Sequence, residues 1–397
     1  MKPHAKILPL IVIAQFCGIS LWFSGNAVMG NLTDEFQLNS GAMGHLTSAV
    51  QLGFIIGTLV FALFTIADRF SPSRVFFLSA IFAAVFNLCT ILSFNSFASL
   101  LGFRFFTGFF LAGIYPVGMK IAADYFQKGL GKSLGFLVGA LVVGTAFPHL
   151  LKGLTYDLPW RNILIFTSSI AAGGGLLILL FVPDGPYRKR SYKPDLMVIF
   201  NVFKIQKFRA AAFGYFGHMW EVYAFWAFVP IILATYLNLH PGKVLNIPLW
   251  SFFIIGLGGP ASVIGGYISQ SFGVRKTAAI ALSLSGICCL VSPLVIIMNS
   301  ELLLIAFLIF WGMVVIADSP LFSTLVAQNT EAETRGTALT IVNSIGFAIT
   351  IISIQLLNVL HELINPSYIY LILATGPIMG LLALYENKAV KAEIFNK

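Results

Sequence analysis

Ionisable side chains stand well inside long apolar stretches of this chain at Arg104, His218, Glu221 and Asp318, with Lys120 and Asp124 nearer the end of one stretch. An ionised group inside a hydrocarbon layer is costly, so such residues face a water-filled cavity or a partner and mark a pathway. Their chemistry is that of solute binding and proton transfer.

His218 and Glu221 are three residues apart, so a helix places them on one face. A low-dielectric site favours the protonated form of a carboxylate, and a neighbouring imidazole titrates near neutrality. Glu221 is therefore the first candidate for a coupling proton site, with His218 beside it. The alternative is a buried pair that only holds helices together.

Asp318 is the second candidate for proton coupling. It precedes Ser319 and Pro320, and a proline removes a backbone donor and opens a helix locally. A carboxylate beside a broken helix can bind a cation or exchange a proton. In the alternative, the helix is only kinked and Asp318 bonds to Ser319 or a neighbour.

Polar side chains at helical spacing predict the wall of a binding cavity. Arg104 shares a stripe with Gly108 and Tyr115. A second stripe and a weaker candidate complete the predicted substrate-binding set: Gln15, Trp22 and Asn26 near the start of the chain, and Gln51. The alternatives are a structural Arg104 that satisfies backbone carbonyls, and a Trp22 that anchors or packs. His149, near a predicted helix end, is assigned no role.

The elements that hold these residues are predicted to be membrane-spanning helices. Only 10% of the residues are charged and 58% are hydrophobic, and the mean hydropathy is +0.90. Stretches of about 20 apolar residues must be helical in a bilayer, where no water satisfies the backbone. Twelve spans are predicted, at residues 7–29, 41–66, 75–93, 97–123, 134–151, 161–182, 210–236, 248–269, 277–298, 302–327, 337–360 and 367–385.

Basic residues predict the orientation, because short loops rich in Lys and Arg stay in the cytoplasm. With both termini inside, 19 bases fall in cytoplasmic segments, and only Lys152, Arg161 and Lys243 fall outside. The basic residues behind the net charge of +9 then set the orientation in the membrane, so a nucleic-acid partner is not expected. The bias fits a multi-pass protein of a bacterial inner membrane, in contact with lipid.

The predicted organisation is two pseudo-symmetric six-helix bundles. The first covers residues 1–183 and the second covers residues 210–397 with a short cytoplasmic tail. Residues 184–209, polar and basic, form a cytoplasmic linker that has room for a short surface helix.

Three motifs carry a resemblance to a known family. Asp68 and Arg69 close the second span, in a loop that runs from Phe64 to Arg74 (loop 64–74). A less complete copy of this loop motif in the second half retains Gly266, Gly273 and Arg275. The third motif, L-x-x-x-R-x-x-x-G, is formed by Leu100, Arg104 and Gly108. With these motifs, the chain resembles the major facilitator superfamily (MFS) over nearly its whole length.

The resemblance implies the MFS fold and a secondary transporter that works by alternating access, is monomeric and has no cofactor. It also implies a charge cluster in which Asp68 joins Asp124 and Arg335 and latches the two bundles on the inside. The implied gating set is the two loops and this cluster: Asp68, Arg69, Arg74, Asp124, Arg335, Gly266, Gly273 and Arg275. The alternative is that these bases only set the orientation and the acids are solvated.

The leading interpretation is a proton-coupled transporter of a small organic solute. A divalent metal or metal-chelate carrier is the alternative, because His218, Glu221 and Asp318 are plausible ligands, although no firm metal spacing supports it. An enzyme is not expected, since the sequence has no metalloprotease motif and no nucleotide-binding loop.

Overall fold

The computed structural model describes residues 6–39, 41–126, 130–154, 159–188, 202–331 and 335–395. These residues are almost entirely helical, and none of them lies in a β-strand. Ten of the described helices are long and apolar enough to cross a membrane, and two shorter apolar helices cover Ile7–Ile19 and Ile369–Tyr385. The predicted all-α membrane architecture is confirmed.

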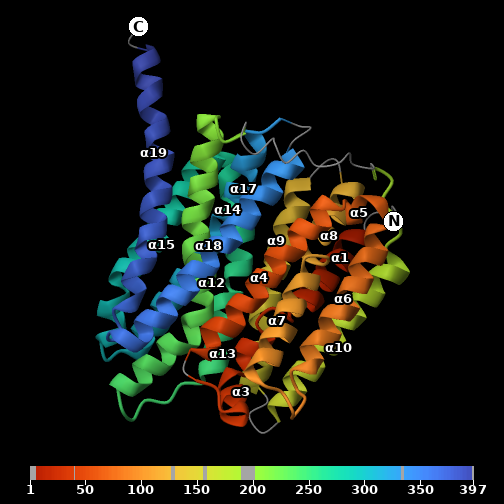
Figure 1. Ribbon diagram of the computed structural model, residues 1–397. Helices are drawn as coiled ribbons and strands as arrows, with labels where there is room; N and C mark the ends of the chain where they lie inside the picture. The colour runs from red at the N-terminus through yellow and green to blue at the C-terminus, as the bar shows by residue number, and fades with distance from the viewer. Residues whose placement is uncertain are drawn as a thin grey trace. The chain divides into compact units, whose positions relative to one another are not determined.

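Unit 1 contains residues Met1–Lys193 and Asn246–Gly259. Its helices (Figure 1) are α1 (Ile7–Ile19), α2 (Ser24–Ala27), α3 (Met29–Phe36), α4 (Ala42–Leu63), α5 (Ile66–Arg69), α6 (Pro72–Cys89), α7 (Phe97–Leu111), α8 (Tyr115–Tyr125), α9 (Leu130–Leu154), α10 (Trp160–Phe181) and α13 (Ile247–Gly256). Helix α13 packs on α9, so residues 246–259 group with the first half of the chain.

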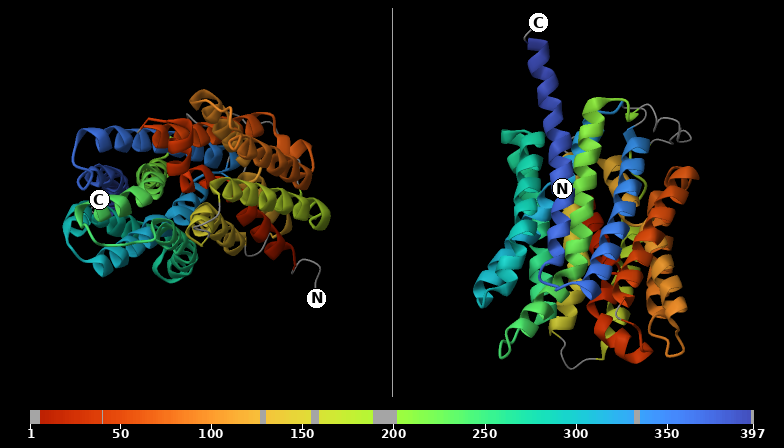
Figure 2. Two further views of the ribbon diagram at one scale, coloured as in Figure 1. Left: turned by 90° about the horizontal axis from the view of Figure 1, so that it is seen from below. Right: turned by 60° about the vertical axis from the view of Figure 1, so that its left-hand side comes forward.

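Unit 2 contains Pro194–Leu245 and Pro260–Lys397. Its helices are α12 (Gln206–Leu239), most of α14 (Gly258–Phe272), α15 (Val274–Ile297), α16 (Glu301–Ala317), α17 (Ser319–Gln328), α18 (Arg335–Leu363), the 3-10 helix η2 (Ile369–Ala374) and α19 (Thr375–Phe395). Helices α12 and α19 lie side by side (Figure 2). The division into bundles of six helices with a linker at 184–209 stays a prediction, and residues 189–201 of that linker lie outside the described residues.

Several spans predicted as single helices are interrupted. The first is broken between α1 and α2 at residues 20–23, so the expectation of one helix over 7–29 is wrong. Residues 112–114 separate α7 from α8, Leu257 separates α13 from α14, and Asp318 separates α16 from α17. Pro320 lies in the first turn of α17, as the sequence led us to expect.

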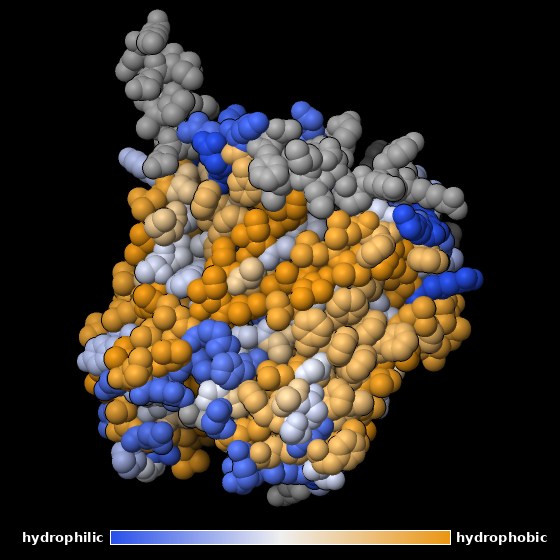
Figure 3. Space-filling view, viewed as in Figure 1, coloured by the Kyte–Doolittle hydropathy of each residue, from blue (hydrophilic) through white to orange (hydrophobic). Residues whose placement is uncertain are grey.

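The surface is apolar along the helices and polar at their ends, as a bilayer requires. Figure 3 shows hydrophobic residues over most of the helices on one face, with hydrophilic residues towards the two ends. Large apolar side chains remain exposed on many helices, among them Phe82, Leu180, Ile264 and Leu294. Exposed apolar surface of this extent is typical of a multi-pass membrane protein, and its contact with lipid stays a prediction.

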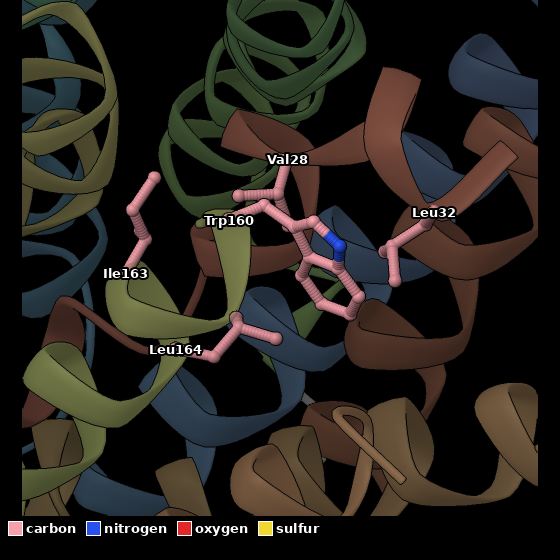
Figure 4. Close-up of a cluster of buried hydrophobic side chains, with 5 residues drawn as sticks. All are labelled: Val28, Leu32, Trp160, Ile163 and Leu164. Carbon is pink, nitrogen blue, oxygen red and sulfur yellow. The ribbon is translucent and has the colours of Figure 1, made fainter. Parts of the chain in front are cut away.

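Helix α3 covers one end of α10 through a small apolar cluster. Figure 4 shows Trp160 facing Val28 and Leu32, with Ile163 and Leu164 on the next turn of α10. The indole Nε1 also donates to Glu35 Oε2 at 3.0 Å. Burying each aliphatic side chain contributes roughly 1.5 to 3 kcal/mol, so this contact fixes the chain that follows the broken first span.

Helices α4 and α7 touch through their backbones. A Cβ atom added at Gly108 would lie 2.0 Å from the carbonyl oxygen of Val50, and one added at Gly53 would lie 1.9 Å from that of Phe105. Only glycine allows this approach, which holds Arg104 of α7 at a fixed place beside α4.

We predict that Gly108→Ala forces the two helices apart and lowers the free energy of unfolding by about 1 to 3 kcal/mol. Thermal unfolding of the purified protein in detergent measures the loss. Gly102→Ala is the matched control on the same helix, because a Cβ atom there meets nothing within 4 Å. Equal melting temperatures for the two variants would contradict the backbone contact.

Candidate functional site

Arg104 lies on α7 and is 2% exposed. Its side chain contacts the break between α1 and α2. Its Nη1 donates to the carbonyl oxygen of Leu21 at 3.3 Å, to Ser24 Oγ at 3.4 Å and to Asn87 Oδ1 at 3.2 Å. Its Nη2 donates to the carbonyl oxygen of Trp22. Each recorded acceptor is uncharged.

The break explains why an arginine is needed there. Residues 20–23 have left the regular helix, so the carbonyls of Leu21 and Trp22 lack their usual helical donors. The guanidinium supplies donors from another helix. A further chain of bonds runs from Ser24 Oγ to Asn87 Oδ1 at 2.6 Å and from Asn87 Nδ2 to Ser168 Oγ at 3.0 Å.

These contacts are the ones expected if Arg104 has a structural role and satisfies backbone carbonyls. A role of Arg104 in substrate binding stays a prediction.

The stripe on the first span packs within unit 1. The ring of Trp22 lies 4.8 Å from that of Phe54 on α4, and Asn26 Nδ2 donates to Thr47 Oγ1 at 2.8 Å. Gln15 is fully buried, and its Oε1 lies 2.3 Å from where a Cβ atom at Gly118 would be.

Two buried amides have no partner among the described residues. Neither polar atom of Gln15 or of Gln51 makes a hydrogen bond there. Tyr115 is half-buried at the first position of α8. Leaving a buried polar atom unpaired costs about 1 to 3 kcal/mol, so these amides have unused capacity to bind a ligand.

Glu221 lies on α12 and is enclosed by three donors from two other helices of unit 2. Its Oε1 accepts from Trp311 Nε1 at 2.6 Å and from Cys289 Sγ at 3.3 Å, while Oε2 accepts from Ser285 Oγ at 2.8 Å. The carboxylate is fully buried. Three donors replace the water that an ionised carboxylate loses on burial.

His218 and Asp318 form a second buried pair in unit 2. His218 Nδ1 lies 2.8 Å from Asp318 Oδ1, and each side chain is only 1% exposed. Asp318 sits at the break between α16 and α17. The other ring nitrogen of His218 and the Oδ2 atom of Asp318 have no hydrogen-bond partner among the described residues.

His218 belongs to both acidic sites. It lies three residues before Glu221 on continuous α12, so about one helical turn separates the two side chains. The predicted set His218, Glu221 and Asp318 is therefore gathered in one unit, around the contact of α12 with α16 and α17.

The acid of loop 64–74 is paired with a base that we did not predict for it. Asp68 Oδ1 lies 2.8 Å from Lys120 Nζ, which also lies 3.6 Å from Asp124 Oδ1. Asp68 and Asp124 are thus brought together, as the resemblance implies. Arg69 and Arg74 are exposed.

Three of the four predicted gating residues of the second half lie at helix ends in unit 2. Arg335 begins α18, and its Nε donates to the carbonyl oxygen of Ala327 at 2.9 Å. Gly273 precedes α15 with a φ of 87°, and Arg275 donates to the carbonyl oxygen of Leu384. Gly266 lies within α14. Their part in gating stays a prediction.

Sequence reasoning missed several polar residues of these sites: Asn87, Ser168, Ser285, Cys289 and Trp311. It noted Lys120 but gave it no role. It also gave no role to His149, which is buried, together with Thr145, one turn away on α9. Neither Thr145 Oγ1 nor His149 Nε2 has a partner among the described residues. Their i, i+4 spacing within an apolar span was the available signal.

The described residues contain no group of three or more His, Cys, Asp or Glu side chains that could hold a metal ion. His218 and Asp318 are two such ligands, and Glu221 bonds to Ser285, Cys289 and Trp311.

Long apolar helices with polar and charged side chains buried among them define a multi-pass membrane protein. The family model described as Major Facilitator Superfamily matches residues 11–354 and, in a second match, residues 211–393. The chain belongs to this superfamily, so the resemblance inferred from its motifs is confirmed.

Two relatives by sequence are also named as transporters. The chain is 25% identical over 238 residues to the uncharacterized transporter YgaY of Escherichia coli O157:H7, a match that covers 56% of this chain and 59% of that protein. It is 30% identical over 175 residues to inorganic phosphate transporter 1-2 of Oryza sativa subsp. japonica, covering 36% and 33%. The matched segments thus span less than two thirds of these relatives.

Solved structures share the fold over nearly the whole chain. A bacterial homologue of the human lysosomal transporter Spinster, in an inward-facing and occupied conformation, matches with a TM-score of 0.70 and 15% identity, covering 97% of this chain and 96% of that one. The nucleoside transporter NupG, as a mutant, matches with a TM-score of 0.73 and 13% identity, covering 96% and 99%. These identities bear on the fold alone.

We predict that Arg104→Met removes the donor of the Trp22 carbonyl and leaves the Leu21 carbonyl with Ser24 Oγ alone, which destabilises the protein by about 1 to 3 kcal/mol. Hydrogen exchange of the amides at residues 20–28 then speeds up, as mass spectrometry measures. Arg74→Met, which changes an exposed base of the same unit, serves as the control. Unchanged exchange and melting in Arg104→Met would remove the structural role of this arginine.

Proposed function

We propose that this protein is a proton-coupled secondary transporter that moves a small organic solute by alternating access. Membership of the superfamily and the transporter names of its relatives support the transport of a solute. The buried pair of His218 and Asp318 at a helix break is the observation that supports proton coupling.

His218 and Asp318 are the groups that we propose exchange the proton. An imidazole and a carboxylate 2.8 Å apart can share one proton between them. Their remaining polar atoms have no partner among the described residues and are therefore available to a proton donor or acceptor. A break at Asp318 gives the helix freedom to change shape when the charge changes.

Glu221 is proposed to have a structural role. Its two oxygens accept hydrogen bonds from three side chains, which hold the carboxyl group in place. Asp318 Oδ2, in contrast, has no hydrogen-bond partner among the described residues. We therefore rank Asp318 above Glu221 for coupling, which reverses the order that the sequence suggested.

The solute is proposed to bind through hydrogen bonds to neutral side chains. The guanidinium of Arg104 already donates to acceptors within the protein, whereas the side-chain amides of Gln15 and Gln51 have no hydrogen-bond partner among the described residues. An amide supplies both a donor and an acceptor, which suits an uncharged polar molecule. A nucleoside, the cargo that the name of NupG gives, is one such molecule.

The same proposal includes the topology. The basic residues support cytoplasmic termini, and the protein is proposed to be a monomeric carrier of a bacterial inner membrane with no enzymatic activity and no cofactor. The site residues offer no specific support for a metal or metal-chelate carrier.

The first experiment identifies a solute and then measures coupling. Purified protein is screened for solutes that raise its melting temperature, including nucleosides, polyols, amino acids and phosphate. The protein is then placed in vesicles that contain a pH-sensitive dye, and the solute is added outside. We expect the internal pH of wild-type vesicles to change as the solute enters.

We predict that Asp318→Asn reduces this pH change to the level of protein-free vesicles, because an amide cannot take up the proton. Exchange of labelled for unlabelled solute continues, since exchange needs no net proton movement. Glu221→Gln is the matched variant and keeps the pH change while it lowers stability. A normal solute-driven pH change in Asp318→Asn would refute the proposed coupling site.

A further inference from the structure

Residues 182–188, which follow α10, are bound along their length to one end of unit 1. Four hydrogen bonds hold them: Ser73 Oγ to the carbonyl of Val182 at 2.6 Å, Tyr125 OH to that of Pro183 at 2.6 Å, Ser71 Oγ to Asp184 Oδ1 at 2.6 Å, and Tyr187 N–H to the carbonyl of Asp124 at 3.0 Å. We call this segment the strap. It joins loop 64–74 to the end of α8.

Arg188 closes the strap on loop 64–74. Its Nη2 donates to the carbonyl oxygen of Asp68 at 3.1 Å and to that of Phe70 at 2.8 Å. Its Nη1 forms an ion pair with Asp184, which itself accepts from Ser71. One guanidinium thus binds two backbone carbonyls and a carboxylate at once, as its planar fork of donors allows.

Loop 64–74 needs such support because its own structure is weak. Helix α5 is a single turn, too short to be stable by itself. Thr65, just before it, has a φ of 48°, which is unfavourable for a β-branched residue and persists only where neighbours enforce it. Lys120 holds the side chain of Asp68 and Arg188 holds its carbonyl, so the acid is fixed from two sides.

The motif places its later base within the loop, at Arg74 in this chain. Arg74 is exposed, whereas Arg188, more than a hundred residues further along the chain, contacts the loop. We propose that Arg188 is a positioning residue for the inner gate, and that the strap makes the start of the linker part of loop 64–74. The link to gating rests on the proposed transport function.

A glycine lets the strap approach α8. A Cβ atom added at Gly185 would lie 2.4 Å from the carbonyl oxygen of Asp124 and 2.7 Å from its Cβ. Gly185→Ala therefore lifts the strap while leaving every base in place. It gives a second test that does not depend on charge.

Limited trypsin digestion of the reconstituted protein tests the docking without knowledge of the solute. Arg188→Gln releases the strap, so cleavage after Lys189 and Arg190 accelerates about tenfold. Gly185→Ala accelerates it as well, and Arg188→Lys rescues it in part, because an ammonium cannot bind both carbonyls and Asp184 together. The controls are Arg74→Gln and Gly173→Ala, where a Cβ atom meets nothing within 4 Å.

Solute exchange separates this inference from the proposed function. In Arg188→Gln we expect the turnover of solute exchange to fall several-fold, because the strap contacts loop 64–74 and α8. The solute concentration for half-saturation stays unchanged, because the strap does not include Gln15 or Gln51. If Arg188→Gln is cleaved at the wild-type rate, or if Arg74→Gln accelerates cleavage equally, the proposed docking of the strap is refuted. The proposed transport function is not affected by that result. Faster cleavage with unchanged turnover would overturn the role in gating. A wild-type protein that moves no solute would defeat the proposed function, whereas the digestion result would still decide the docking.

Discussion

An ionised side chain inside an apolar bundle persists only where fixed dipoles or a counter-charge replace the water that it has lost. This protein meets that constraint in three ways. Arg104 donates to backbone carbonyls, Glu221 accepts from three side chains, and His218 faces Asp318.

Helix breaks and buried charges depend on one another here. A broken helix frees backbone groups that neither lipid nor apolar side chains can satisfy. In unit 1 the break at 20–23 receives a cation from α7, whereas in unit 2 the break between α16 and α17 carries its own acid, Asp318. The break at 20–23 is therefore stabilised by a residue of another helix. The break between α16 and α17 can change shape when the charge of Asp318 changes.

The sequence predicted the features that depend on local pattern. Hydropathy placed the spans, and Pro320 indicated the break at Asp318. The break at 20–23 contains no proline, and its stabilising partner, Arg104, lies about eighty residues away, so no local signal announces it. The partners of Glu221 come from α15 and α16, and the bases beside Asp68 are Lys120 and Arg188. Pairings of this kind are set by helix packing, which a single sequence does not reveal.

The arrangement in unit 2 has an electrical consequence. Two acids and one imidazole share the interior of that unit, and the proposed exchange adds one proton to them. If the proton and an uncharged solute move in the same direction, each transport cycle carries a single positive charge across the bilayer. A membrane potential of about 100 mV is worth about 2.3 kcal/mol per charge. Voltage alone, with no difference in pH, would then concentrate the solute roughly fiftyfold on the negative side.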